Sequence, residues 1–127
     1  MRISAPSSLV GRAAVRERHR RGRINAPPLR SLYPALASLQ VEFEFSDRVD
    51  FIPSPQVTVF HPPAPAYFRF ACPYSDCDGE FDLTGVIDTA VNAHGPGTSG
   101  QLYCQGTRHR GVRCTLCLDY SISPHPV

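Results

Sequence analysis

The residues of this 127-residue chain best suited to chemistry are five cysteines in its C-terminal half. They are Cys72, Cys77, Cys104, Cys114 and Cys117. An odd number of cysteines cannot all pair as disulfides. No apolar stretch at the N-terminus resembles a secretory signal, so we expect a reducing, cytoplasmic location, where clustered cysteines favour a metal ion. The sequence therefore predicts one structural Zn²⁺ held by thiolates.

Strand parity indicates which cysteines bind this ion. In an extended strand over 112–122, Cys114 shares a face with Leu116, whereas Cys117 points to the opposite face. Cys104 would meet Cys114 across an antiparallel pair. Parity thus favours as metal ligands Cys72, Cys77, Cys104 and Cys114. The alternative uses the two-residue spacing Cys114–Cys117 and leaves Cys104 free.

Other residues near the cysteines complete the metal hypothesis. Gly79 follows the first cysteine pair, and a left-handed backbone there would turn amides toward the sulfurs. Asp78 and His109 are possible fourth ligands. A catalytic zinc would keep an open position, but neither residue has a partner that suggests water activation. No nucleophile arrangement, phosphate loop or carboxylate pair stands out. We therefore expect a non-enzymatic protein, and the alternative is a metal- or thiol-dependent enzyme subunit.

The elements that position the cysteines are mostly strands. Between 39 and 45, Leu39, Val41, Phe43 and Phe45 alternate with polar residues, which predicts a half-buried strand. Further strands are expected at 57–60, 67–71, 80–83, 101–105 and 112–122. Helices are expected at 84–93, capped by Thr84, and at 31–39, and 46–55 is expected to be a loop or hairpin connection. The predicted fold class is mainly β (β-rich with one short helix).

Two cysteine-bearing turns around one metal resemble the zinc-ribbon group. The resemblance covers about residues 68–122 and uses Cys72 and Cys77 in the first turn. Two of the three later cysteines, Cys104, Cys114 and Cys117, form the second turn. The resemblance implies a small domain with a structural Zn²⁺ and no particular function. The first spacing, the inserted helix and the fifth cysteine depart from the usual pattern.

Charge divides the chain into two parts. Residues 1–30 contain eight Arg and one Glu, which gives +7, and residues 31–127 contain five Arg and ten acidic residues, which gives −5. The first part has few large apolar side chains, so we expect a disordered Arg-rich arm at 1–30 and a single β-rich zinc-ribbon-like domain at 31–127. Removal of 1–24 should then leave the fold intact. A targeting segment is the alternative for this arm.

The arginines indicate nucleic acid, RNA or DNA, as the partner. The residues predicted to contact it are Arg16, Arg18, Arg20, Arg21 and Arg23 in the arm and Arg108, Arg110 and Arg113 near the tip of the ribbon. A base-stacking platform is a further possibility, formed by Tyr67, Phe68, Phe70, Tyr74 and Phe81. The alternative is a protein-interaction or structural module whose partner is another protein. No apolar run is long enough to span a membrane.

Overall fold

The computed structural model describes residues 7–47 and 55–127. Its elements are α1 (Ser7–Asn25), α2 (Leu29–Leu32), β1 (Leu36–Ser46), β2 (Gln56–Phe60), β3 (Arg69–Ala71), β4 (Glu80–Asp82), α3 (Thr84–Asn92), β5 (Thr98–Tyr103), the 3-10 helix η1 (His109–Gly111) and β6 (Cys117–Pro126). The mainly β class is confirmed. The start of the predicted arm, 1–6, and most of the predicted connection at 46–55 lie outside the described residues.

The main sheet is antiparallel, with the strand order β2-β1-β6-β5. Apolar residues of β1 alternate with polar ones, so Leu39, Val41 and Phe45 are buried on one face. The ladder with β6 pairs Val41 with Ile122 and Phe45 with Leu118. Paired residues lie on the same face of a sheet. These side chains therefore form the core, and the cysteine cluster is continuous with it.

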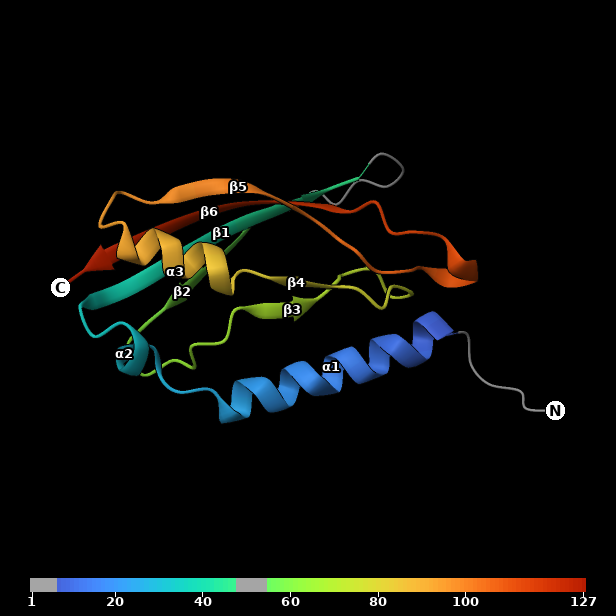
Figure 1. The fold of residues 1–127 in the computed structure, drawn as a ribbon, viewed down its shortest axis with the longest axis horizontal. Helices are drawn as coiled ribbons and strands as arrows, with labels where there is room; N and C mark the ends of the chain where they lie inside the picture. Colours follow the sequence, from blue (N-terminus) through green and yellow to red (C-terminus); the bar gives the residue numbers. More distant parts are fainter. Residues whose placement is uncertain (1–6, 48–54) are drawn as a thin grey trace.

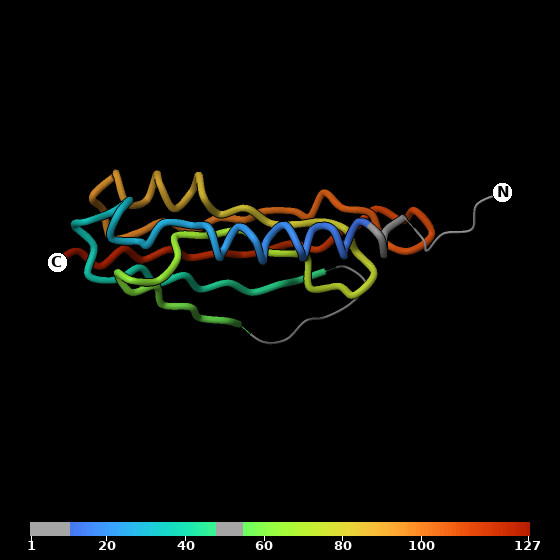
Figure 2. Tube along the Cα trace, turned by 90° about the horizontal axis from the view of Figure 1, so that it is seen from below, coloured from blue at the N-terminus to red at the C-terminus, as the bar shows by residue number. Residues whose placement is uncertain are grey.

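Two further layers lie on the inner face of this sheet. Strands β3 and β4 form a separate antiparallel hairpin, which lies between the sheet and α1 in Figure 1. Seen from below, α1 runs along the length of the molecule, with β2 toward one side and α3 toward the other (Figure 2). Helix α3 packs against β6, and α1 contacts both β3 and η1. The sheet, the hairpin and α1 thus converge at the end of the molecule that contains η1.

The first part of the chain differs from the expected disordered arm. Residues 7–25 form α1, in which Arg12, Val15 and His19 are buried. The prediction of disorder was wrong here because the helix packs through arginine, histidine and glycine more than through large apolar side chains. None of the described helices combines the length and the apolar composition that a membrane span requires.

Two predicted boundaries are also corrected. The short helix expected at 31–39 lies earlier, as α2 at Leu29–Leu32, because β1 begins at Leu36 and pairs there with the end of β6. The last strand begins at Cys117 rather than at Val112. The preceding residues, 112–116, are not part of β6, but the Cys104 amide donates to the Leu116 carbonyl and the Cys114 amide donates to the Gly106 carbonyl, both at 3.0 Å. The helix at 84–93 and the strands at 57–60 and 80–83 agree closely with α3, β2 and β4.

Candidate metal centre

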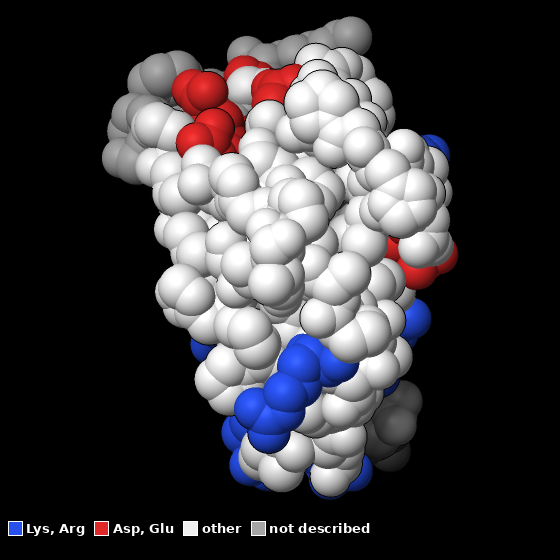
Figure 3. Space-filling model, turned by 90° about the vertical axis from the view of Figure 1, so that its left-hand side faces the viewer, with Lys and Arg blue, Asp and Glu red and all other residues white. Residues whose placement is uncertain are grey.

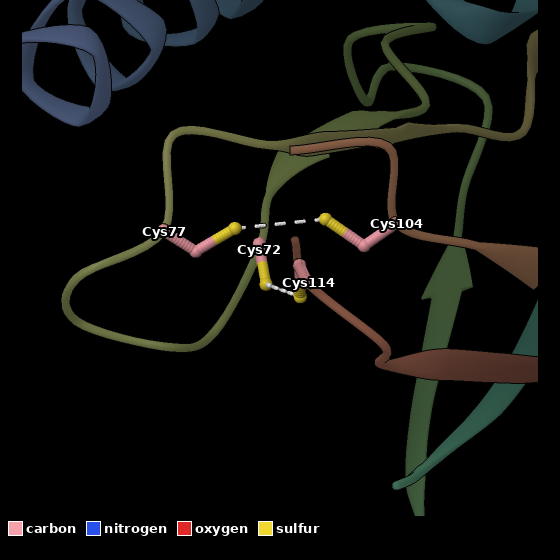
Figure 4. A group of neighbouring side chains, drawn as sticks. All are labelled: Cys72, Cys77, Cys104 and Cys114. Carbon is pink, nitrogen blue, oxygen red and sulfur yellow. Dashed lines mark hydrogen bonds between the residues drawn. The ribbon is translucent and has the colours of Figure 1, made fainter. Parts of the chain in front are cut away.

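Four cysteine sulfurs point toward a common centre (Figure 4). Their side chains, from Cys72, Cys77, Cys104 and Cys114, are buried, and all four Sγ atoms lie within 4.8 Å of one another. Sγ of Cys72 is 3.9 Å from Sγ of Cys114, and Sγ of Cys77 is 3.6 Å from Sγ of Cys104. Sulfurs that bind one ion tetrahedrally at a Zn–S distance of about 2.3 Å lie about 3.8 Å apart. The cluster therefore has the spacing of a tetrahedral thiolate site and can hold a metal ion.

The two halves of the cluster share a Cys-x-Gly turn. The Gly79 amide donates to Sγ of Cys77 at 3.3 Å, and the Gly106 amide donates to Sγ of Cys104 at 3.4 Å. Such hydrogen bonds favour the thiolate form of a sulfur. The sequence reasoning missed Gly106, although the repeated Cys-x-Gly pattern was a signal that could have identified it.

Close backbone approach explains why both turns contain glycine. A Cβ at Gly79 would overlap Sγ of Cys104, and a Cβ at Gly106 would overlap the backbone of Gly79. The glycines with positive φ in the described chain are Gly97 and Gly111. The left-handed conformation expected at Gly79 is therefore absent, and the glycine is needed for space instead.

The pKa values of the four clustered thiols shift in different directions. Burial raises the pKa of Cys77 to about 12 and also raises the pKa of Cys114. A hydrogen bond to Cys104, together with burial, raises the pKa of Cys72. The same hydrogen bond lowers the pKa of Cys104 to about 6. The buried cluster alone thus favours one thiolate, and four thiolates together would need a compensating cation.

Helix α1 supports the first cysteine turn through Arg12. The Arg12 guanidinium donates to the carbonyl oxygens of Cys72 at 2.6 Å, Tyr74 at 2.7 Å and Cys77 at 3.4 Å. Arg12 is buried, so these carbonyls obtain partners that water cannot supply. The sequence reasoning treated Arg12 as one member of a basic tail, and nothing in the local sequence separates it from the other arginines.

The second cysteine turn is held by acidic residues of the first. Asp78 accepts from the Thr107 amide at 2.7 Å. Asp76 accepts from the His109 amide at 3.2 Å and from Nε of Arg108 at 3.0 Å. Asp78 and His109, which the sequence offered as possible ligands, therefore connect the two turns and lie outside the group of clustered sulfurs.

Cys117 lies outside the cluster. It occupies the start of β6, opposite Tyr103 of β5 and Ser46 of β1. Burial raises the pKa of its thiol. The structure thus brings together the four cysteines that parity favours and leaves Cys117 within the sheet.

The predicted arginine groups lie on α1 and around η1, two elements that contact each other. All five of the predicted α1 arginines are exposed: Arg16, Arg18, Arg20, Arg21 and Arg23. Several are partly neutralised, because Glu17 pairs with Arg20 and Arg21 and Glu80 pairs with Arg18. At the tip, Arg110 is exposed, whereas Arg108 pairs with Asp76 and lies over the Tyr74 ring at 3.9 Å, and Arg113 donates to Gln105.

The predicted aromatic platform is divided. Phe81 is buried in the core, and the Tyr74 hydroxyl donates to Asp47 at 2.5 Å beside the metal centre. Tyr67, Phe68 and Phe70 remain together and line an apolar cleft beside β1 and β2. Phe68 is itself buried in the core, whereas Tyr67 and Phe70 are half-buried.

No model of a known protein family matches the chain, and no curated protein or solved structure matches it. The evidence for function is therefore the geometry of the cysteine cluster and the arrangement of charge around it.

Proposed function

We propose that this chain is a small, non-enzymatic, zinc-ribbon-like protein whose cysteine cluster binds one structural Zn²⁺. The observation that carries the proposal is the buried group of four sulfurs at tetrahedral spacing. Four protein ligands complete the coordination of zinc, so such a site has no open position for water or substrate. Zinc and iron both accept four thiolates, and five free cysteines fit a reducing compartment such as the cytoplasm.

Metal analysis tests this proposal directly. Protein purified under reducing conditions should contain about one zinc per chain, because the four thiolates form one closed site. Replacement by Co²⁺ should produce the intense visible and charge-transfer bands of a tetrahedral thiolate complex. If the purified protein contained iron in place of zinc, the four thiolates would form a rubredoxin-like iron site, and the assignment of zinc would be wrong. A preparation that binds neither metal would contradict the proposal.

Nucleic acid is the proposed partner. The exposed arginines of α1 and the exposed Arg110 of η1 support this, because exposed guanidinium groups can pair with phosphates. In Figure 3, basic side chains gather along the lower part of the molecule, on the side of α1, and acidic ones gather above. Exposed ion pairs such as those of Glu17 are weak because water and salt screen them, so phosphates can compete for these arginines.

Salt-dependent binding tests the partner. Affinity for generic single-stranded RNA or DNA should fall as salt rises, with a slope set by the number of phosphates contacted. Arg16→Gln should reduce that slope by about 0.7 to 0.9. Arg30→Gln on α2 is the control and should change the slope less. Arg48 is a less suitable control position, because it lies outside the described residues. Absence of binding even at low salt would exclude this partner.

A protein-interaction module remains the second candidate, and β2 favours it. This strand forms an edge of the main sheet, and Val57 and Val59 on it are 58% and 43% exposed. An edge strand with exposed apolar side chains can pair with a strand of another chain. If no nucleic acid binds, a concentration-dependent change in sedimentation that Val59→Lys abolishes would support this candidate.

A further inference from the structure

An apolar cleft opens between the inner face of β1 and β2 and the strand β3. Its volume is about 260 Å³. The aromatic residues that line it are Phe43, Phe60, Tyr67, Phe68 and Phe70. Phe43 and Phe70 stack with a centroid distance of 5.3 Å, and Phe60 meets Phe68 edge to face at 5.2 Å. The cleft therefore has an aromatic lining, in which Phe68 is buried and the other four rings are half-buried.

A second hollow of about 370 Å³ adjoins the cleft along α1. It is lined by Arg16, Arg20 and Arg23, which lie on one side of the helix at spacings of four and three residues, together with His19 and Ala71. Burial lowers the pKa of His19, so the arginines supply its charge. No acidic residue of the described chain lines this hollow.

Two contacts join the hollows. Arg23 lines both of them. Tyr67 of the apolar cleft is hydrogen-bonded at 2.5 Å to His19 of the basic hollow. Among the described residues, no carboxylate pairs with Arg16 or Arg23, so these two cations are available to an anion. Aromatic surface and positive charge thus lie within the width of one side chain.

We propose that these two hollows form a site for one nucleotide of a single-stranded nucleic acid, with the base in the aromatic cleft and its phosphate against Arg16 and Arg23. This inference rests on the proposed nucleic-acid function and adds where and how the strand is held. Bases stack on aromatic side chains without strong sequence preference, while a basic groove follows the backbone.

The combination of shapes favours a nucleotide over other anions. In a single-stranded nucleic acid, each flat base lies a short distance from a phosphate. The apolar cleft and the basic hollow are likewise adjacent, so one could hold the base and the other the phosphate. An acyl anion would fill an apolar cleft but would not need an aromatic lining. An extended peptide has no fixed negative charge beside each apolar side chain. The occupant that matches both surfaces is therefore a base with its phosphate.

The test uses the full-length, zinc-loaded protein and an oligo(dT) strand that contains one 2-aminopurine. Thr58 lines the cleft on the edge strand and is exposed, so Thr58→Trp should fill the cleft without removing a charge. Val57→Trp, on the opposite face of the same strand, is the matched control. We expect quenching of 2-aminopurine on binding. Thr58→Trp should remove this quenching and weaken binding about tenfold, whereas Val57→Trp should change neither.

An abasic strand and two arginine variants complete the test. The abasic strand should bind wild type and Thr58→Trp equally weakly, and Arg23→Gln should weaken binding of both strands more than Arg30→Gln does. If base removal and Thr58→Trp have no effect while Arg23→Gln weakens binding, the cleft proposal is wrong and the nucleic-acid function stands. If no strand binds, both are wrong. Binding of decanoate that Thr58→Trp blocks, without quenching by oligo(dT), would show an acyl-anion site and also overturn the proposal.

Discussion

Gly79 and Gly106 show how strongly the metal centre depends on single residues. Each follows a cluster cysteine by two positions, and each amide donates to that sulfur. The same two residues form the contact between the cysteine turns, where a Cβ on either would overlap the other turn. The absence of a side chain therefore determines how closely the four sulfurs can gather.

Gly79→Ala should accordingly weaken metal binding and lower stability. The added Cβ would displace Sγ of Cys104, and rigid packing around a metal site converts small displacements into loss of affinity. Zinc content and the thermal transition measure both effects. Gly85→Ala is the matched control, because a Cβ there meets nothing within 4 Å and alanine is favoured over glycine in a helix by about 1 kcal/mol. Equal behaviour of the two variants would contradict the steric argument.

Cys104 and Cys117 are the two candidates for the fourth ligand position, and their replacement by serine should affect zinc binding differently. Cys104→Ser should lose zinc, because it removes one of the four clustered sulfurs. Cys117→Ser should retain zinc with a small change in stability, since Cys117 lies in the sheet outside the cluster. Zinc stoichiometry of both variants, measured after dialysis, decides the assignment. Zinc loss from Cys117→Ser alone would instead support the pair Cys114–Cys117.

At the scale of elements, α1 is the part of the fold that could not be predicted from the sequence. Strand β1 could be predicted because its apolar residues alternate with polar ones and the buried face follows from that period. Helix α1 lacks an apolar stripe of comparable strength. Its packed face consists of Gly11, Arg12, Val15, His19 and Gly22, whose spacing is helical but whose residue types suggest a solvated tail. Hydrogen bonding and close backbone approach replace apolar burial here, and neither is visible in a hydrophobic pattern.

The metal cluster was more accessible to sequence reasoning than the helix that supports it. Residue type and strand parity group Cys72, Cys77, Cys104 and Cys114, because few other arrangements bury four thiols together. The contacts of Arg12 depend on the path of the chain between residues far apart in sequence. Parity also failed to show that β6 begins only at Cys117, since residues 112–116 join the 104–108 segment through isolated backbone hydrogen bonds in place of a regular ladder.

Arg12→Ala should therefore destabilise the protein although it removes a positive charge from a basic segment. It leaves the carbonyl oxygens of Cys72, Tyr74 and Cys77 without their donor. Unsatisfied buried groups cost about 1–3 kcal/mol. Chemical denaturation should detect this loss. Arg16→Ala, one turn further along and exposed, is the control and should change the free energy of unfolding by no more than about 0.5 kcal/mol.

Deletion of α1 extends the same argument. The disordered arm expected from the sequence could be removed without loss of the fold, whereas the helix in the structure covers β3 and buries Val15 and His19. A chain that begins at Ala26 should melt at a clearly lower temperature than the full-length protein. It should also lose most affinity for nucleic acid, because seven of the thirteen arginines are removed with residues 1–25. An unchanged melting temperature would restore the interpretation of α1 as a separable arm.

At the scale of the whole molecule, the metal centre is the point where distant parts of the chain meet. The hairpin of β3 and β4 supplies two cysteines, the segment between β5 and β6 supplies the other two, and α1 supplies Arg12. The cluster belongs to the same continuous hydrophobic core as the main sheet, so the two should not unfold independently.

Removal of the metal should therefore unfold much of residues 68–122 and destabilise the sheet along with them. A chelator should lower the melting temperature and broaden the transition, and added zinc should restore both, because binding free energy at such sites is also folding free energy. Hydrogen exchange should show the earliest loss of protection at the turns at 72–79 and 104–114.

The stability of the zinc-loaded protein should also depend on pH. Zinc must displace thiol protons, and burial raises the pKa of Cys77 to about 12. The stabilisation by zinc should therefore be greatest at neutral to mildly alkaline pH and decrease as the pH falls. A metal-free protein with the same cooperative transition as the zinc-loaded form would show that thiol packing alone maintains the fold, and the structural role of the metal would have to be abandoned.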